Sequence, residues 1–281
     1  MKKRICGILL VVFVAVFCVT GYKLLSYYKE SREQKAQYSG LEQLMEQARQ
    51  EAAQAQTPEQ TPTGPGGEPE ETVNRADVLV PALDKETGET VMVLPEFKPL
   101  YELNPDIVGW IKVPGTNISY PVMQSETPNY YLYVSFYDEY SNHGTIYAKE
   151  ECDIFTPSDN ITIYGHHMND ESMFHALDGY VDREFWEEHK TFSFNTIFER
   201  HDYEVIAVFR TSANLGQGFT YHRFIDAQNQ AEFDEFVAKC KELALYDTGL
   251  TAEYGDKLVC LSTCEYTLDN GRLVVVGKRA S

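Results

Sequence analysis

The chain contains a series of short β-prone segments with few helices between them, and this pattern most constrains its fold. Residues 104–124 combine an Asn-Pro start, a Trp-Ile-Lys-Val strand, a Pro-Gly turn and another short β-prone run. Helical spacing of apolar residues is clear in the C-terminal part only at residues 172–180 and 227–245. Further strands are predicted at residues 144–148, 160–164, 191–195, 203–211, 257–263 and 272–278. Many short strands with few helices indicate a mainly β fold, a closed or nearly closed barrel rather than a βαβ sheet.

The N-terminus carries the pattern of a membrane anchor. Lys2-Lys3-Arg4 precede an uncharged apolar run, residues 5–22, which at ~1.5 Å per residue nearly spans a bilayer core. Because basic residues stay on the cytoplasmic side, we expect residues 1–4 to form a cytoplasmic tip and residues 5–25 a single-pass transmembrane signal anchor. Everything after the anchor is then extracellular. A cleavable signal peptide is the alternative, but no clear small-x-small cleavage site follows the run, which favours a retained anchor.

Two polar segments separate this run from the globular part. Residues 26–56 are rich in Glu, Gln, Ala and Lys and have Leu41, Leu44 and Met45 at helical spacing, which predicts a solvated, helical juxtamembrane spacer. Residues 57–75 are rich in Pro, Gly and Glu and cannot bury enough apolar surface to order themselves, so they are predicted to be a flexible linker. Residues 76–281 are left for one domain of about 200 residues.

The net charge and the cysteine spacing argue against several classes of function. The formal net charge of −19 argues against a nucleic-acid partner, because phosphate binding needs a cationic face. Two of the six cysteines lie in the apolar run, and the wide, irregular spacing of the other four, Cys152, Cys240, Cys260 and Cys264, forms neither a disulfide framework nor a metal signature. An exported protein with this pattern is expected to keep at least one free thiol for chemistry.

Cys264 and Arg272 form the first candidate pair. Cys264 ends an apolar run, and eight positions later Arg272 opens another. Asp269-Asn270-Gly271 supplies turn chemistry, so a hairpin would bring the two side chains together. Each signal alone is weak, because a cysteine after a strand is more often a buried small hydrophobe and a surface arginine is usually solvated.

A histidine pair supplies the candidate general acid/base. His166 and His167 follow an apolar strand and a glycine in ITIYGHHMND, residues 161–170, and His166 is the candidate. A metal site is the alternative. Adjacent histidines on a strand point to opposite faces, and no third ligand follows or precedes them at a spacing typical of a metal site. Metal binding is therefore disfavoured.

Three segments in this order resemble the signature segments of the sortase family, and of class B sortases in particular. The segments are TIYGHHM at residues 162–168, MFHALDGYVDREFWEEHKTFSFNT at residues 173–196 and LSTCEYTLDNGRLVVVGK at residues 261–278. The resemblance covers residues 104–278, and the layout of anchor, tether and C-terminal domain also matches the family. The resemblance implies an eight-stranded sortase-type β-barrel with an N-terminal helix and a helix inserted late in the chain, at residues 227–245.

The resemblance also assigns roles within the motifs. It implies that His166 is the catalytic general acid/base, Cys264 the nucleophile and Arg272 the group that stabilises substrate and oxyanion; His167 is not carried over. Substrate contacts are expected from Ser262, Leu132 and Glu265. Cys260 stands where the family often has a hydroxyl side chain, and core packing is favoured over a second reactive thiol.

The implied activity is that of a membrane-anchored cysteine transpeptidase with a thioester intermediate. Such an enzyme cleaves the C-terminal sorting signal of exported proteins after Thr and transfers the acyl group to an amine of the peptidoglycan precursor, lipid II, without metal or organic cofactor. Its partners are surface proteins or pilins with sorting signals, lipid II, and the cell membrane through residues 5–25.

Four alternatives stay open at this point. One is a pilus-assembling class B sortase that uses a pilin lysine, and another is a catalytically silent membrane-tethered adhesion or sensor domain. A cysteine protease that hydrolyses its acyl-enzyme is chemically close. A cysteine L,D-transpeptidase is disfavoured, because its His-Gly-Cys-Arg-like run is not in the sequence.

Overall fold

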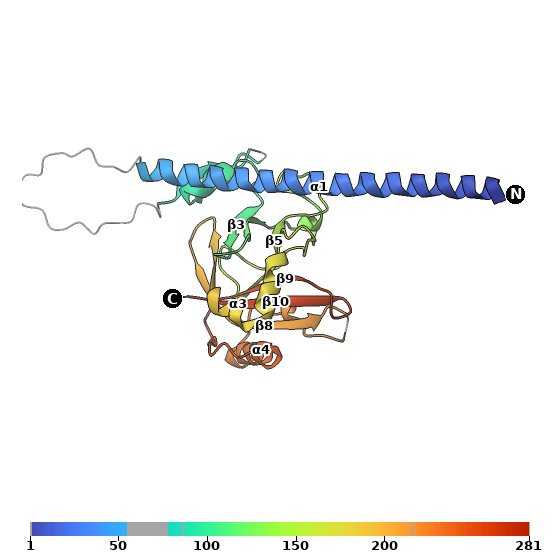
Figure 1. Ribbon diagram of the computed structural model, residues 1–281. Helices are drawn as coiled ribbons and strands as arrows, with labels where there is room; N and C mark the ends of the chain where they lie inside the picture. The colour runs from blue at the N-terminus through green and yellow to red at the C-terminus, as the bar shows by residue number, and fades with distance from the viewer. Residues whose placement is uncertain (1, 55–77, 86, 215, 281) are drawn as a thin grey trace, which may run out of the picture. The chain divides into compact units, whose positions relative to one another are not determined.

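The computed structural model describes residues 2–54, 78–85, 87–214 and 216–280, and the chain divides into two compact units, Met1–Gly40 and Leu41–Ser281 (Figure 1). The linker predicted at residues 57–75 lies outside the described residues. One long helix, α1, Lys2–Gln54, makes up the first unit and supplies the first residues of the second.

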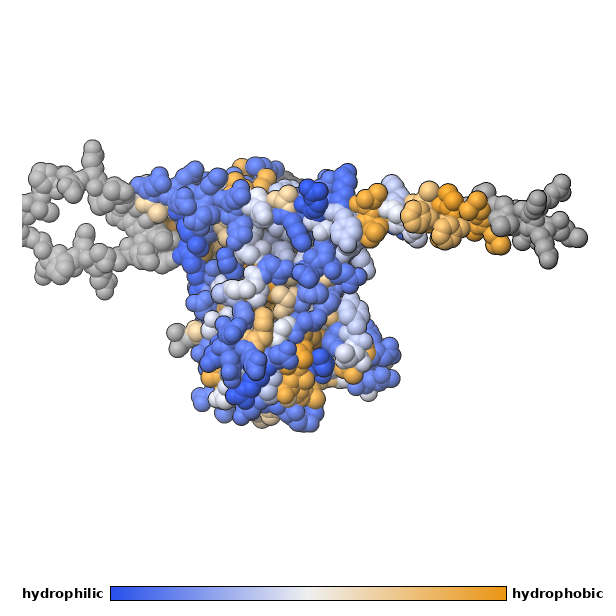
Figure 2. Space-filling view, in the orientation of Figure 1, coloured by the Kyte–Doolittle hydropathy of each residue, from blue (hydrophilic) through white to orange (hydrophobic). Residues whose placement is uncertain are grey.

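The N-terminal part of α1 presents apolar side chains to its surroundings. Large exposed hydrophobic residues follow one another between Leu9 and Val19, and Figure 2 shows this stretch as hydrophobic. Among the residues that the structure describes, no helix is both long and apolar enough to cross a membrane. The side chains of residues 1–8 and 11 lie outside the described part, and the transmembrane segment predicted at residues 5–25 is not confirmed.

The second unit is built on a closed barrel of eight strands in the order β10-β8-β7-β3-β4-β5-β6-β9, with β9 pairing β10 to close the ring. The predicted mainly β, closed eight-stranded architecture is confirmed. Most neighbours are antiparallel, but β4–β5 and β6–β9 are parallel. The strands are β3 (Ile107–Lys112), β4 (Ser119–Met123), β5 (Ile146–Ala148), β6 (Asn160–Tyr164), β7 (Thr191–Thr196), β8 (Asp202–Ser212), β9 (Leu258–Glu265) and β10 (Gly271–Arg279).

Short elements connect and cover the barrel. A small antiparallel pair, β1–β2, precedes it. The predicted helix at residues 227–245 is present as α4, which begins after Asn229, whose side chain accepts a hydrogen bond from the Glu232 N–H. The remaining elements are β1 (Val80–Leu83), β2 (Thr90–Val93), η2 (Pro95–Phe97), α2 (Lys98–Tyr101), η3 (Tyr130–Leu132), η4 (His175–Val181), α3 (Arg183–Glu188), η5 (Tyr221–Arg223) and α4 (Gln230–Leu243).

The sequence of β10 contains an unbroken apolar run because both faces of this strand are buried. Leu273 to Val276 are all fully buried, since one face of the strand lines the barrel and the other is covered. Val274 and Val276 pack in one cluster with Phe233 and Phe236 of α4, which lies beside β8 (Figure 1). A strand covered on both faces needs no polar alternation.

The helix predicted at residues 172–180 is wrong in type and position. The structure has the 3-10 helix η4 there, followed by the short helix α3. Glu171 and Met173 adopt positive φ angles of 64° and 58°, so a regular α-helix cannot begin at Ser172. Gly179 leaves room for the Phe185 ring, which a Cβ atom at this position would overlap.

The end of α1 contacts the barrel unit rather than forming only a solvated spacer. Leu41 is 1% exposed, and the Glu42 carboxylate accepts hydrogen bonds from Lys112 at 3.2 Å and from the Ser119 hydroxyl at 2.9 Å. Arg49 reaches Glu96, whose side chain is 1% exposed, at 3.1 Å. Residues 41–54 therefore belong to the second unit.

Breaking the buried ion pair at Glu96 should destabilise this unit. The Glu96 Oε1 atom accepts hydrogen bonds from the Arg200 guanidinium at 2.5 and 2.9 Å. Among the described residues, Arg200→Ala leaves Arg49 as the one ion-pair partner of this buried carboxylate, and we expect the free energy of unfolding to fall by about 3 kcal/mol. Urea denaturation measures it.

A matched control is Arg183→Ala, which breaks an exposed pair with Glu187 at 3.1 Å. That variant should change stability by less than about 0.5 kcal/mol. Equal midpoints for the two variants would contradict the structural role of Glu96.

Candidate active site

The parallel pairing of β6 with β9 brings His166 and Cys264 to one edge of the barrel. Tyr164 pairs with Ser262, and the Gly165 N–H donates to the Ser262 carbonyl at 3.1 Å. The Thr263 hydroxyl donates to the Gly165 carbonyl at 2.9 Å. His166 and Cys264 each follow a paired residue by two positions, so they stand at the same level, Cys264 on β9 and His166 just past the end of β6.

The antiparallel pairing of β9 with β10 places Arg272 directly opposite Cys264. Directly opposed residues of an antiparallel pair share a face, with Cβ atoms about 4.5–5.5 Å apart. The connecting turn contains Asn270 at a φ of 48° and ends on Gly271, as its Asp-Asn-Gly sequence predicted. The Arg272 Nη1 atom donates to the carbonyls of Asn270 and Gly271 at 3.3 and 2.8 Å, which holds one arm of the guanidinium against the turn.

Five of the six predicted site residues line one groove with a cavity volume of about 560 Å³. Cys264 and Arg272 are half-buried there, so solvent and a peptide can reach them. The groove is formed by the ends of β6, β8, β9 and β10, by the segments that contain η3 and η5, and by β5 with the residues that follow it. The five residues are Leu132, His166, Ser262, Cys264 and Arg272.

The His166 ring is held by a backbone carbonyl. Its Nε2 lies 2.7 Å from the Leu132 oxygen. A carbonyl only accepts, so Nε2 carries the proton of the neutral ring and Nδ1 is the basic nitrogen. Burial lowers the pKa of His166, the Leu132 carbonyl partly offsets this by favouring the charged ring, and His143 lowers the pKa further.

Leu132 thus contributes its main chain as well as its side chain. Gly144, at a φ of 57°, packs against the carbonyl oxygens of Tyr131 and Leu132, where a Cβ atom would overlap them. The Thr145 N–H also donates to the Tyr131 carbonyl at 2.9 Å. These contacts fix η3, and through it the histidine. From the sequence, Gly144 was expected to begin a strand, and nothing there indicated this role of the Leu132 carbonyl.

Ser262 is buried at the floor of the groove and shares a 2.5 Å hydrogen bond with the Tyr221 hydroxyl. Burial raises the pKa of Tyr221 to about 12, although its hydrogen bond with Ser262 acts in the opposite direction. Tyr221 was not predicted from the sequence, since the segment containing η5 carries no motif and reaches the site only through the fold.

Glu265 does not line the groove, and its expected substrate contact stays a prediction. Successive side chains of a strand point to opposite faces, so Glu265 turns away from the face of Cys264. Burial would raise the pKa of Glu265, but hydrogen bonds from Thr267 and Leu268 and the charge of Arg210 hold it below its usual value. The carboxylate accepts from the N–H groups of Thr267 at 2.9 Å and Leu268 at 3.1 Å. Glu265 therefore orders the loop that leads to Arg272.

Cys260 is fully buried in the cluster beneath α4, and burial raises the pKa of its thiol far above the usual value. The expectation that it packs in the core is confirmed. His167, which was not assigned a role, lies 2.6 Å from the Asp178 carboxylate and 4.4 Å, ring to ring, from His175.

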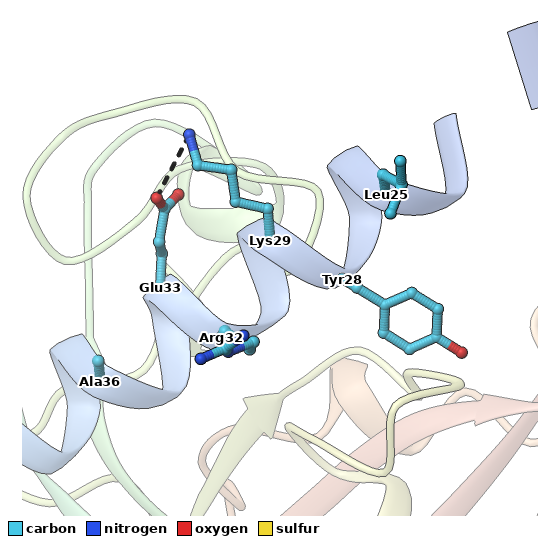
Figure 3. Close-up of a pocket in the computed structure, with 6 residues that line it drawn as sticks. All are labelled: Leu25, Tyr28, Lys29, Arg32, Glu33 and Ala36. Carbon is cyan, nitrogen blue, oxygen red and sulfur yellow. Dashed lines mark ion pairs between the residues drawn. The ribbon is translucent and has the colours of Figure 1, made fainter. Parts of the chain in front are cut away.

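A second hollow runs along the first unit (Figure 3). Its six lining residues, Leu25, Tyr28, Lys29, Arg32, Glu33 and Ala36, all come from α1. Lys29 and Glu33 form an exposed ion pair at 3.5 Å. Side chains of a single helix do not converge on a ligand, so this hollow offers no site.

Comparisons with known proteins agree with this geometry. The Sortase domain family matches residues 111–280. The chain belongs to the sortase family. Sortase B of Staphylococcus aureus (strain NCTC 8325 / PS 47) is 26% identical over 278 residues, which is 98% of this chain and 97% of that protein. Sortase B of Listeria monocytogenes serovar 1/2a (strain ATCC BAA-679 / EGD-e) is 31% identical over 185 residues, 65% of this chain and 73% of that one.

A solved structure supports the same class. The Staphylococcus aureus sortase B–substrate complex has a TM-score of 0.69 and 25% identity, and the match covers 90% of this chain and 99% of that one. Together these relatives make the protein a class B sortase, and its predicted enzyme type, a cysteine transpeptidase, is confirmed.

The His166 ring of this sortase should be neutral at pH 7. Because burial outweighs the Leu132 hydrogen bond, its pKa lies below the ordinary 6.5. Imidazole resonances followed by NMR from pH 4 to 8 should therefore titrate with a midpoint below 6.5, and His166→Gln would assign the signal by removing it. A midpoint above 6.5 would contradict the buried, carbonyl-held ring.

Proposed function

We propose that the protein cleaves the C-terminal sorting signal of exported proteins after Thr and joins the new acyl end to an amine of the peptidoglycan precursor, which anchors surface proteins to the cell wall. One observation carries this proposal: β9 is paired on one side with β6 and on the other with β10, in registers that bring His166, Cys264 and Arg272 into one groove. A nucleophile, an acid/base and a rigid cation are the parts that acyl transfer needs.

In the first half-reaction the Cys264 thiol gives its proton to the His166 imidazole, and its sulfur attacks the Thr carbonyl carbon. The carbonyl oxygen becomes an oxyanion. The C–N bond then breaks, the leaving amine takes the proton from the imidazolium, and a thioester to Cys264 remains. The basic nitrogen in this scheme is Nδ1, since Nε2 donates to Leu132.

In the second half-reaction an amine attacks the thioester carbon. His166 removes a proton from the amine, and as the tetrahedral intermediate collapses to the amide, the imidazolium returns this proton to the departing Cys264 sulfur. The energy of the cleaved peptide bond is conserved in the thioester. An acceptor amine must therefore reach the groove before water does.

Arg272 stabilises the oxyanion. Its contacts with the turn use Nη1, which leaves the other N–H groups of the guanidinium to face the substrate carbonyl. Leu132 and Ser262 border the groove and are placed to contact the sorting signal.

Thioester formation tests the proposal directly. The Cys264→Ala protein should form no acyl-enzyme with a peptide that carries a Thr-containing sorting signal, because no other described thiol lines the groove. Intact-mass spectrometry of the wild-type protein should show the thioester, and adding an amine should convert it to the amide product. Equal turnover with and without the amine would indicate a hydrolase instead.

Arg272→Lys is the matched variant for the cation. It keeps the charge but loses the planar fork, so kcat/KM should fall at least about 100-fold if oxyanion stabilisation is its role. Full activity of Arg272→Lys would remove Arg272 from the mechanism.

Residues 5–25 are proposed to hold the enzyme at the cell membrane, with its N-terminus in the cytoplasm and the catalytic domain outside. Support comes from the apolar side chains that α1 exposes between Leu9 and Val19 and from the preceding Lys2-Lys3-Arg4. The full chain should sediment with membranes, and protease added to intact cells stripped of cell wall should digest the catalytic domain. Recovery of the full chain in the soluble fraction would refute the anchor.

A further inference from the structure

The groove that contains Cys264 has a cationic end. Its described lining includes three basic side chains, those of Lys149, Arg223 and Arg272, together with His222, and only one carboxylate, Glu150. The whole chain has a formal net charge of −19, so this balance is opposite to that of the protein as a whole. A positively charged groove on a protein of negative net charge indicates a negatively charged ligand.

Two of these cations stand at a distance from the nucleophile. The Lys149 N–H donates to the Thr162 carbonyl at 2.8 Å, and Thr162 pairs with Cys260. Lys149 is therefore level with a residue four positions before Cys264 on β9. At about 3.3 Å per residue this is roughly 13 Å along the strand.

The segment that contains Arg223 spans this level: Tyr221 before it bonds Ser262, two positions before Cys264, and Phe224 after it bonds Asn160, whose partner Leu258 is six positions before Cys264. The Asn160 side-chain amide donates to the Phe224 carbonyl at 2.8 Å, and the Asn160 N–H donates to the Ile225 carbonyl at 2.9 Å. Asn160 begins β6, two residues before Thr162. Lys149 and Arg223 therefore approach the start of β6 from two different connections.

His222 lies among the cations. Burial lowers its pKa, and the charges of Lys149, Arg223 and Arg272 lower it further. Lys149 has an ion pair with Glu151, whose side chain is 57% exposed. Arg223 is exposed and has no ion pair with a carboxylate within the described ranges 2–54, 78–85, 87–214 and 216–280.

We propose that Lys149, His222 and Arg223 form a subsite for an acidic side chain of the sorting signal, about four residues before the Thr that acylates Cys264. The inference rests on the proposed function. An extended peptide spans about 3.3–3.6 Å per residue, so a chain bound through its Thr carbonyl at Cys264 needs about four residues to cover 13 Å. The acyl donor is the substrate that this geometry favours, because it is fixed at Cys264 while it extends along the groove.

Binding to the Cys264→Ala protein provides the first test, since it needs no turnover. A set of fluorescent sorting-signal peptides carries one Glu, or one Gln as its isostere, at each position from six residues before the Thr to two residues after it. We expect the Glu peptide to bind roughly threefold more tightly than its Gln partner when the substitution lies three to five residues before the Thr. The preference should decrease as salt is raised.

Variants of Arg223 test whether this residue causes the preference for Glu over Gln. Arg223→Gln should bring the Glu-to-Gln affinity ratio close to one, and Arg223→Glu should invert it and favour a Lys peptide. Arg183→Gln, which removes an exposed arginine that does not line the groove, is the matched control and should keep the wild-type ratio. The same ratio in all variants, or a preference only for Glu placed after the Thr, would overturn the subsite.

A second assay tests whether the subsite instead binds a carboxylate of the acceptor amine. Acyl transfer by the wild-type protein is compared with glycinamide and with diaminopimelate as acceptors. If Arg223→Gln changes this acceptor ratio and leaves the donor ratio intact, the subsite serves the acceptor and the donor proposal is wrong. If no peptide forms a thioester with the wild-type protein, the proposed function fails, while the affinity ratios still decide the subsite.

Discussion

The pairing of β9 on both sides is the constraint on which the site depends. Its parallel partner β6 brings His166, and its antiparallel partner β10 brings Arg272, while β9 itself carries Cys264. Because side chains alternate with a period of two, a slip of one residue in either register would turn Cys264 away from its partner. The backbone hydrogen bonds of three strands thus fix a catalytic geometry that short polar side chains could not hold by themselves.

One face of β9 changes along its length from core to active site. Cys260 lies under α4, Ser262 is buried but bonded to Tyr221, and Cys264 is half-buried in the groove. The three side chains have different environments because different segments cover β9 at each of these positions. The cover consists of α4 and the connection from β8 that contains η5. That connection packs Tyr221 into the core and lines the groove with His222 and Arg223, so one connection contributes to both the core and the groove.

Much of the fold was predictable because its signals are local. Apolar and β-branched runs bounded by turn residues located the strands, β6 at its observed bounds, and the spacing of apolar residues located α4. The prediction failed at η4, where positive φ angles at Glu171 and Met173 override a helix-like spacing. The end of α1 reads as polar, and only its contacts through Leu41, Glu42 and Arg49 make it part of the barrel unit.

The sequence by itself determined the barrel strands, the turn before Arg272 and the motifs that contain His166, Cys264 and Arg272. Each of these features depends only on residues that are close together in the sequence. Tertiary structure alone decided which partners these side chains meet. The carbonyl that holds His166 comes from η3, the hydroxyl that bonds Ser262 comes from η5, and the Glu265 carboxylate, one residue from Cys264, bonds the loop that leads to Arg272. The physical reason is that these contacts join segments far apart in the chain, and closure of the barrel brings such segments together.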